Sequence, residues 1–207
     1  MIDGRNITKL FGETGLKSMD IKVKKGEMAG LSGSSGCGKS TLLNILTGML
    51  RPDSGTILIG GVDISKLSEK KRTALRGNVI GYMMQKNALL PELTVMQNII
   101  FPAYIAKKHP TEKDAEEIAE KLSLTKQLGS YPSQLSGGEY RRGMLARILL
   151  LDTPVIVADE PTSNLDRESA VIVRDILTEA NKNGVTVLAA SHDQLLLDSA
   201  DRVIAVG

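Results

Sequence analysis

Gly33-Ser34-Ser35-Gly36-Cys37-Gly38-Lys39-Ser40-Thr41 fits the phosphate-binding pattern G-x-x-x-x-G-K-[ST] at every required position. Its glycines let the backbone curl with positive φ, so that successive N–H groups point at phosphate oxygens. Lys39 supplies a positive charge for the β/γ oxygens, and Ser40 can offer its hydroxyl to a bridging Mg²⁺. The stretch predicts a nucleoside triphosphate site; the alternative is a glycine-rich turn that carries a lysine by chance. The residues expected to contact the nucleotide are Ser34, Gly36, Cys37, Gly38, Lys39, Ser40 and Thr41.

The flanks of this loop have the context that the motif requires. Residues 28–32 form a short strand-like run before it. After it, apolar residues line one face of a helix that is expected to continue until Arg51-Pro52 ends it; they are Leu42, Leu43, Ile45, Leu46 and Met49. A strand, a glycine-rich loop and a helix in this order place the helix N-terminus, with its partial positive charge, against the phosphates.

Composition limits the class of protein. The chain has 207 residues, of which 42% are hydrophobic, so it can bury the core of one domain. The net charge of +2 and the scattered lysines and arginines argue against nucleic acid as the main partner, and residues 70–72 are interpreted as solvated surface. The single cysteine excludes an internal disulfide, as expected in a reducing cytoplasm. Apolar runs such as 155–158 are far shorter than the ~20 residues of a membrane helix.

The first third of the chain predicts a small antiparallel β layer. Residues 7–11 and 19–23 alternate polar and apolar side chains, and 56–59 pairs with 62–64 across a Gly60-Gly61 turn. Phe11 lies at the end of the first of these strands. Its ring could stack on a purine base or belong to the core, and the sequence leaves both open.

Two later segments predict buried parallel strands whose ends carry polar side chains. The continuous apolar run 155–160 closes on Asp159 and Glu160, and 185–190 leads into Ser191 and His192. The helix between them makes the connection a strand-helix-strand unit. Because ligands bind at the carboxyl edge of parallel sheets, Asp159, Glu160 and His192 should lie beside the phosphate loop. The expected fold class is α/β, a P-loop NTPase with a mainly parallel sheet.

The segment 87–151 predicts an inserted helical subdomain. Strand 79–84 ends at Gln85, and helix starts follow near Thr94, Thr111 and Ser136. Residues 1–86 and 152–207 would then form the nucleotide-binding core of a single domain.

A second anion site is predicted where the last of these helices begins. Ser136 and Glu139 form a capping box, and Gly137 and Gly138 leave the N–H groups of the first turn uncovered; a plain helix cap is the alternative. Together with the phosphate loop, Gln85, Asp159-Glu160, the 163–166 segment Ser-Asn-Leu-Asp and His192, this order of motifs resembles the ATP-binding subunits of ABC transporters. Residues 85–91 and 161–166 resemble the lipoprotein-releasing and macrolide-export branch.

The resemblance implies a role for each motif. Two ATPase subunits, as a homodimer or a pair, would face head to tail, each ATP lying between one phosphate loop and the partner's Ser136, Gly137 and Gly138. Mg²⁺ would be held by Ser40, Gln85 and Asp159, the last through water. Catalysis would fall to Lys39, Glu160, which polarises the attacking water, and His192, which contacts the γ-phosphate. Asp166 would lie across the dimer seam, and Phe11 stands where the family often has tyrosine against the adenine.

The resemblance also implies a partner and a place in the cell. The chain would hydrolyse ATP to drive a separate membrane permease, which would contact the loop after Gln85 through the apolar residues Ala88, Leu89 and Leu90. It would then be a cytoplasmic subunit held peripherally at the inner face of the cell membrane.

Two other classes of function fit the sequence less well. A soluble ABC-type ATPase acting on nucleic acid generally carries coiled-coil or zinc-bearing insertions, and this sequence has neither heptads nor paired cysteines. A P-loop kinase or GTPase would lack the Ser136 motif, and a GTPase would carry the guanine-reading string Asn-Lys-x-Asp, which is absent here. The transporter subunit is the favoured hypothesis.

Overall fold

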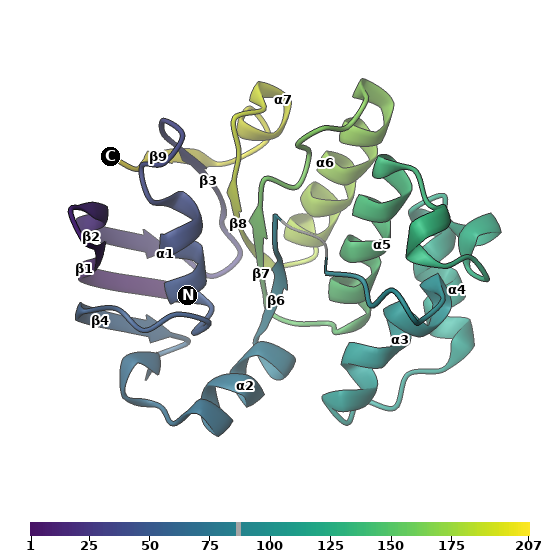
Figure 1. Ribbon diagram of the computed structural model, residues 1–207, viewed down its shortest axis with the longest axis horizontal. Helices are drawn as coiled ribbons and strands as arrows, with labels where there is room; N and C mark the ends of the chain where they lie inside the picture. The colour runs from purple at the N-terminus through teal and green to yellow at the C-terminus, as the bar shows by residue number, and fades with distance from the viewer. Residues whose placement is uncertain (86–87) are drawn as a thin grey trace.

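The computed structural model describes residues 1–85 and 88–207, and a parallel sheet forms its centre (Figure 1). The strand order is β6-β7-β8-β3-β9, and all four strand pairs are parallel. Every residue of β7 and β8 is buried, which explains their continuous apolar sequences. The predicted parallel core is confirmed. Its strands are β3 (Met28–Ser32), β6 (Ile80–Met83), β7 (Val155–Asp159), β8 (Thr186–Ala190) and β9 (Arg202–Ala205).

An antiparallel sheet forms a second layer, at the left of Figure 1. It has the order β2-β1-β4-β5 and confirms the predicted β layer, although its first two strands are longer than expected. One face packs on the phosphate-loop helix α1 through a shared core that includes Ile7, Leu43 and Ile57. The strands are β1 (Ile2–Phe11), β2 (Thr14–Val23), β4 (Ser54–Ile59) and β5 (Val62–Asp63).

Helix α1 (Lys39–Leu46) is shorter than the sequence predicts. Gly48 adopts a φ of +69°, and the N–H of Met49 donates to the carbonyl oxygen of Asn44 at 2.8 Å. A left-handed residue just past the last turn ends a helix in this way. The expectation that the helix continues to Arg51-Pro52 is therefore wrong, and Met49 is 51% exposed instead of lining a helical face.

The helices predicted within 87–151 are present and form a separate lobe at the right of Figure 1. They are α3 (Val95–Ile105), α4 (Glu112–Lys121) and α5 (Gly137–Leu150), with short 3-10 turns at Thr125–Gln127 and Pro132–Gln134. Thr94, Thr111 and Ser136 each cap a helix with a complete capping box. The exact division into a core of 1–86 and 152–207 and a subdomain of 87–151 stays a prediction.

Within residues 1–85 and 88–207, the remaining helices are α2 (Glu69–Asn78), α6 (Arg167–Lys182) and α7 (Gln194–Leu197), with a 3-10 turn at Ile64–Lys66. Helix α6 buries Val173, Ile176 and Leu177 on one side, as its spacing predicts. Helix α2 was not expected. The reading of 70–72 as solvated surface is wrong for Arg72, which is 6% exposed and pairs with Glu69.

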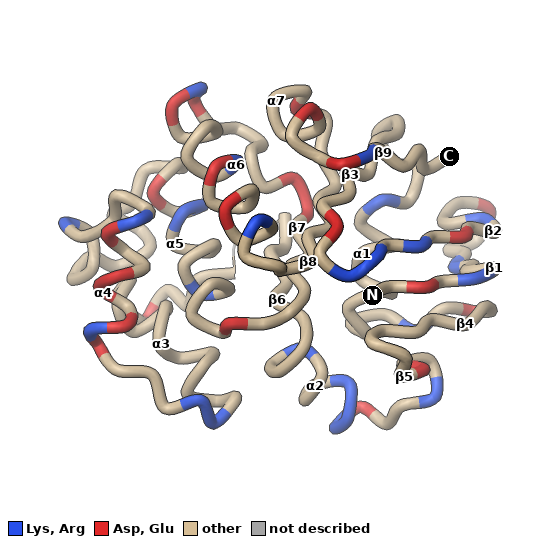
Figure 2. The backbone as a smooth tube through the Cα atoms, turned by 180° about the vertical axis from the view of Figure 1, so that it is seen from behind, with Lys and Arg blue, Asp and Glu red and all other residues tan. Residues whose placement is uncertain are grey.

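Charges of both signs are mixed over both lobes, and the described chain shows no continuous basic face (Figure 2). This distribution gives no support to the nucleic-acid alternative. Among residues 1–85 and 88–207, no helix combines the length and apolar character needed to cross a lipid bilayer.

Candidate functional site

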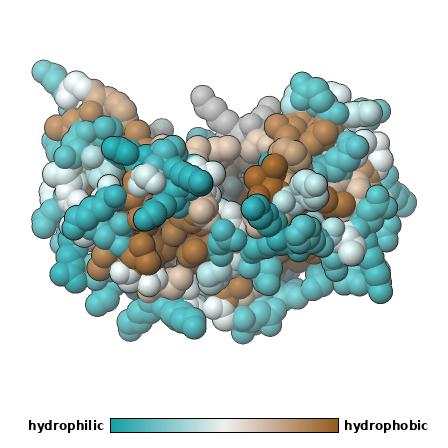
Figure 3. Space-filling view, turned by 90° about the horizontal axis from the view of Figure 1, so that it is seen from below, coloured by the Kyte–Doolittle hydropathy of each residue, from teal (hydrophilic) through white to brown (hydrophobic). Residues whose placement is uncertain are grey.

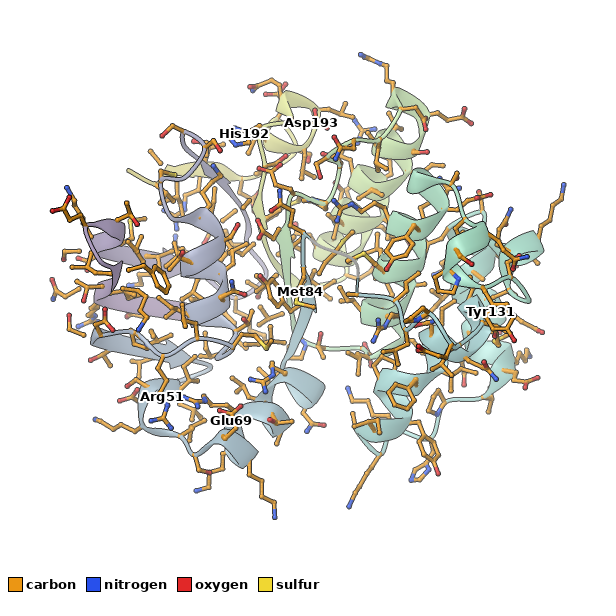
Figure 4. All side chains as sticks on the ribbon, viewed as in Figure 1. Arg51, Glu69, Met84, Tyr131, His192 and Asp193 are labelled. Carbon is orange, nitrogen blue, oxygen red and sulfur yellow. The ribbon has the colours of Figure 1, made fainter. Side chains whose placement is uncertain are left out.

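A cavity of about 620 Å³ lies at the carboxyl edge of the parallel sheet. It is enclosed by the phosphate loop, Gln85, the loop after β7 and the loop after β8; Figure 4 labels His192 and Asp193 at this edge. Three strand ends therefore converge here, as predicted. The lining residues are Ser35, Gly36, Gly38, Lys39, Ser40, Thr41, Gln85, Glu160, Thr162, Ser163, Asn164, His192 and Asp193.

The phosphate loop depends on close backbone packing. A Cβ built at Gly33 would lie 2.3 Å from the carbonyl oxygen of Val206, and Gly38 enters helix α1 with φ +104°. Lys39 is 7% exposed, and its ammonium donates to the carbonyl oxygens of Gly33 at 2.7 Å and Ser34 at 3.1 Å. It also lies 3.1 Å from Nε2 of His192. The side chain is thus aimed into the cavity beside the strand ends.

Glu160 faces the same space from the end of β7. It is a non-glycine residue with φ +50°, a conformation that costs on the order of 1–3 kcal/mol and persists only where its surroundings hold it. Its N–H donates to the carbonyl oxygen of Ala190 at 2.8 Å, and its carboxylate accepts from the N–H of His192 at 3.4 Å. His192 Nε2 lies 3.5 Å from the other carboxylate oxygen. The residue thus lines the cavity from a strained backbone position.

Asp159 is almost fully buried, and its Oδ1 has no hydrogen-bond partner among the described residues. Burial raises the pKa of this carboxyl group, while the Ser40 hydroxyl and the Lys39 ammonium act in the opposite direction. An unpartnered buried carboxylate oxygen next to a serine hydroxyl suits a hydrated divalent cation. Ser40, Gln85 and Asp159 therefore fit the predicted Mg²⁺ site.

The remaining predicted residues lie on other surfaces. Ser136 and Gly137 are exposed at the start of α5, and Gly138 is half-buried there, outside the cavity lining. Asp166 caps α6: it accepts from the Ser169 N–H at 2.8 Å, and this contact lowers the pKa of its carboxyl group. The phosphate loop and the Ser136 motif therefore do not line the same cavity within this chain.

Phe11 is 54% exposed at the end of β1, so the alternative that its ring belongs to the core is wrong. The Lys9 ammonium lies 5.8 Å from the ring centroid. Base stacking by Phe11 stays a prediction. Ser34 is exposed, and Cys37 is half-buried against the core beside α1.

The prediction for the loop after Gln85 needs a correction. Lys86 and Asn87 lie outside the described residues, and Leu89 is 6% exposed in the core that the helical lobe shares with the parallel sheet. The Leu89 N–H donates to the Tyr140 hydroxyl at 3.0 Å. Leu89 therefore offers no free apolar surface, whereas Ala88 and Leu90 are half-buried.

Sequence reasoning missed several residues at the cavity. Ser35, Thr162, Ser163, Asn164 and Asp193 line it, and each lies inside or next to a motif that had been singled out, which is the signal that could have found them. Arg141, which binds the backbone of Gln85, carried no such signal.

The comparisons with known proteins agree with this geometry. The profile of the family described as ABC transporter matches residues 16–163. An uncharacterised ABC transporter ATP-binding protein of Methanocaldococcus jannaschii is 36% identical over 99% of this chain and 94% of its own length. The lipoprotein-releasing system ATP-binding protein LolD of Legionella pneumophila (strain Paris) is 41% identical over 92% of this chain and 86% of its own. The macrolide export ATP-binding/permease protein MacB of Bartonella henselae is 39% identical over 97% of this chain, which spans 32% of that longer protein.

A solved structure supports the same assignment. The dimeric, post-hydrolysis state of the ATP-binding cassette MJ0796 bound to ADP and Pi matches with a TM-score of 0.94 and 31% identity, covering 100% of this chain and 94% of that one. The chain therefore belongs to the ABC transporter family, as one of its ATP-binding, ATP-hydrolysing subunits. The predicted family, fold and ATPase activity are confirmed; the roles of individual residues stay predictions.

Proposed function

We propose that this chain closes head to tail with a second ATPase subunit around two ATP molecules and so drives a separate membrane permease. The carrying observation is the division of the expected site between two surfaces: Lys39, Glu160 and His192 face or line one cavity, and Ser136 lies outside it. A partner that brings its own α5 N-terminus to the cavity would complete the site. The dimeric cassette with ADP and Pi supports this arrangement.

The cavity residues have chemistry that suits phosphate transfer to water. The Lys39 ammonium donates to two neutral carbonyl oxygens, and charged phosphate oxygens are stronger acceptors for it. Glu160 holds a carboxylate at the cavity wall, where it would orient and polarise the attacking water. The His192 side chain is 54% exposed and lines the cavity, where it would contact the γ-phosphate.

Mg²⁺ would be held by the Ser40 hydroxyl, the Gln85 side chain and, through water, Asp159. When bound, the ion would neutralise charge on the β- and γ-phosphate oxygens. The unpartnered Oδ1 of Asp159 supports this ligand set.

Glu160→Gln tests the shared site. The amide keeps the side-chain shape but removes the charge that orients water, so ATP-bound dimers should accumulate while hydrolysis stops. Size-exclusion chromatography with and without ATP would measure this, and exposed Glu116→Gln on α4 is the matched control, expected to behave like the parent. A Glu160→Gln protein that hydrolyses at the parent rate, or stays monomeric with ATP, would refute the proposal.

The permease contact is proposed at an apolar groove between the two lobes. A cavity of about 220 Å³ lies there, and Figure 3 shows apolar side chains on both sides of the notch between the lobes. Exposed Phe101, Tyr104 and Ile105 on α3 extend the apolar surface. A permease segment in this groove would touch Ala88, three residues after Gln85, and would hold the chain at the inner face of the cell membrane. The groove is lined by Met49, Arg76, Ile80, Tyr82, Met83, Met84, Ala88, Pro102, Met144, Arg147, Ile148 and Leu151.

Met49→Glu tests the groove, because it places a charge on a wall residue that is 51% exposed. We expect loss of co-purification with the permease from detergent-solubilised membranes of the source organism, with an unchanged melting temperature. Val62→Glu is the control, since Val62 is 49% exposed on the antiparallel sheet, away from the groove. Equal recovery of the permease by both variants would exclude this groove.

A further inference from the structure

Arg141 lies in the second turn of α5 and joins segments from both lobes. One guanidinium nitrogen donates to the carbonyl oxygen of Gln85 at 2.9 Å and reaches that of Met84 at 3.4 Å. Figure 4 labels Met84 between the lobes. The other terminal nitrogen donates to the Ser163 hydroxyl at 2.8 Å. One side chain therefore holds the backbone of the predicted metal ligand Gln85 and the loop that follows Glu160.

Ser163 passes this contact on to Glu160. Its hydroxyl donates to the carbonyl oxygen of Glu160 at 3.0 Å, and its N–H donates to the same oxygen at 3.2 Å. Glu160 has the left-handed φ of +50°, so these two bonds fix the strained residue from its carbonyl side. The path from Arg141 to the backbone of Glu160 contains only Ser163.

The other arginines of α5 make different contacts. Arg142 donates to the Ser169 hydroxyl at 3.0 Å, and Arg147 donates to the carbonyl oxygen of Ala88. Arg141 is half-buried; burial lowers the pKa of its guanidinium, and the nearby carboxylates of Asp159 and Glu160 oppose that shift. A planar guanidinium can serve two acceptors in different directions, which a lysine ammonium on a flexible stem does less well.

We propose that Arg141 is a positioning residue that ties helix α5 to both Gln85 and Glu160 of its own chain. It does not line the cavity, so it acts through these two residues. Helix α5 is also the helix that would meet the ATP bound by the partner's phosphate loop. Through Arg141, the geometry of this chain's own site would therefore depend on how its α5 contacts the partner's site. Only that last consequence rests on the proposed head-to-tail dimer.

The kinetic test uses Arg141→Gln, Arg141→Lys and Ser163→Ala in the full chain. For Arg141→Gln we expect kcat for ATP hydrolysis to fall about tenfold with a much smaller change in KM, because the substrate contacts remain and the aim of Glu160 is lost. Arg141→Lys should recover part of the rate. The double variant Arg141→Gln/Ser163→Ala should be slowed by less than the product of the two single effects, since both variants remove the bond between Arg141 and Ser163. Arg174→Gln on α6 is the matched control and should keep the parent rate.

Amide hydrogen exchange gives a readout that does not need hydrolysis. In Arg141→Gln, the Ser163 amide should exchange faster than in the parent, while amides of α1 stay unchanged. The proposal is overturned if kcat is kept, if the effects of Arg141→Gln and Ser163→Ala multiply, or if exchange rises equally throughout the chain. A parent chain that fails to dimerise with ATP would refute the proposed function instead, and the exchange measurement would still decide the role of Arg141.

Discussion

At the scale of single residues, the burial of Asp159 opposes ionisation of its carboxyl group. Burial raises the pKa of its carboxyl group above the ordinary value of 3.8, so the folded chain holds this proton more tightly than the unfolded chain does. Stability from this group is therefore greatest below that ordinary value and is lost as the pH rises through the raised folded pKa. The ionised carboxylate carries this penalty once the pH lies above the folded pKa.

Asp159→Asn should remove this penalty and abolish function together. We expect the free energy of unfolding at pH 7 to rise by about 1 kcal/mol, or roughly 2–4 °C in melting temperature, because the charge is removed from a buried carboxylate with one unpartnered oxygen. The gain should shrink as the pH is lowered toward 4. ATP hydrolysis with Mg²⁺ should fall on the order of a hundredfold. Thermal unfolding at pH 7 and pH 4.5 measures the first effect, with exposed Asp198→Asn as control; a destabilised Asp159→Asn protein would contradict the account.

At the scale of elements, the start of α5 is packed against the start of α6. A Cβ built at Gly138 would lie 2.5 Å from the Ser169 hydroxyl, whereas one at Gly137 meets nothing within 4 Å. That hydroxyl cannot simply turn away, because it donates to Asp166 at 2.9 Å and accepts from Arg142 at 3.0 Å. The two adjacent glycines therefore differ: Gly138 leaves room for the Ser169 hydroxyl, whereas Gly137 has no such contact.

Gly138→Ala should lower the free energy of unfolding by about 1–3 kcal/mol, since the methyl group breaks the contacts of Ser169. Gly137→Ala is the matched control on the same turn and should be neutral or slightly stabilising, because alanine favours helix more than glycine does. Urea unfolding of both variants gives the comparison. Equal losses would mean that the α5–α6 contact has no such role.

Elements could be predicted where a local signal exists and not where packing decides. Thr111 and Asp114 lie within one turn, so their capping box predicts the helix start that the structure has. The end of α1 follows from Gly48 rather than from the apolar spacing that extends to Met49. Helix α2 was missed because its residues are mainly polar, and Arg72 is buried only through tertiary packing.

The same limit applies to the candidate site. The sequence could predict that Asp159, Glu160 and His192 lie close together, because parallel strands end at one edge of the sheet. It could not predict the contacts of Arg141, because the partners Gln85 and Ser163 are 56 and 22 residues away and belong to loops whose path no pattern predicts.

At the scale of the whole molecule, the separation of Ser136 from the phosphate loop within one chain sets up a test of which chain completes the site. The lesions are Lys39→Ala, which removes the cavity ammonium, and Ser136→Arg, which puts bulk and charge at an exposed helix start. Ser136 makes a capping bond at 3.3 Å and lies outside the core, so its replacement should cost about 1 kcal/mol and leave the chain folded.

We expect opposite results when the two lesions are placed in different chains or in the same chain. All proteins carry Glu160→Gln to hold ATP-bound dimers, and differently tagged chains are mixed and captured through one tag with ATP present. If sites are shared, Lys39→Ala mixed with Ser136→Arg leaves one site with an intact loop and an intact helix start, so heterodimers form. A chain with both lesions, mixed with a chain that has neither, leaves no intact site and should not be captured. If each chain completed its own site, the second mixture would keep one intact site and the first would keep none. Capture of heterodimers from the second mixture alone would therefore show that each chain completes its own site.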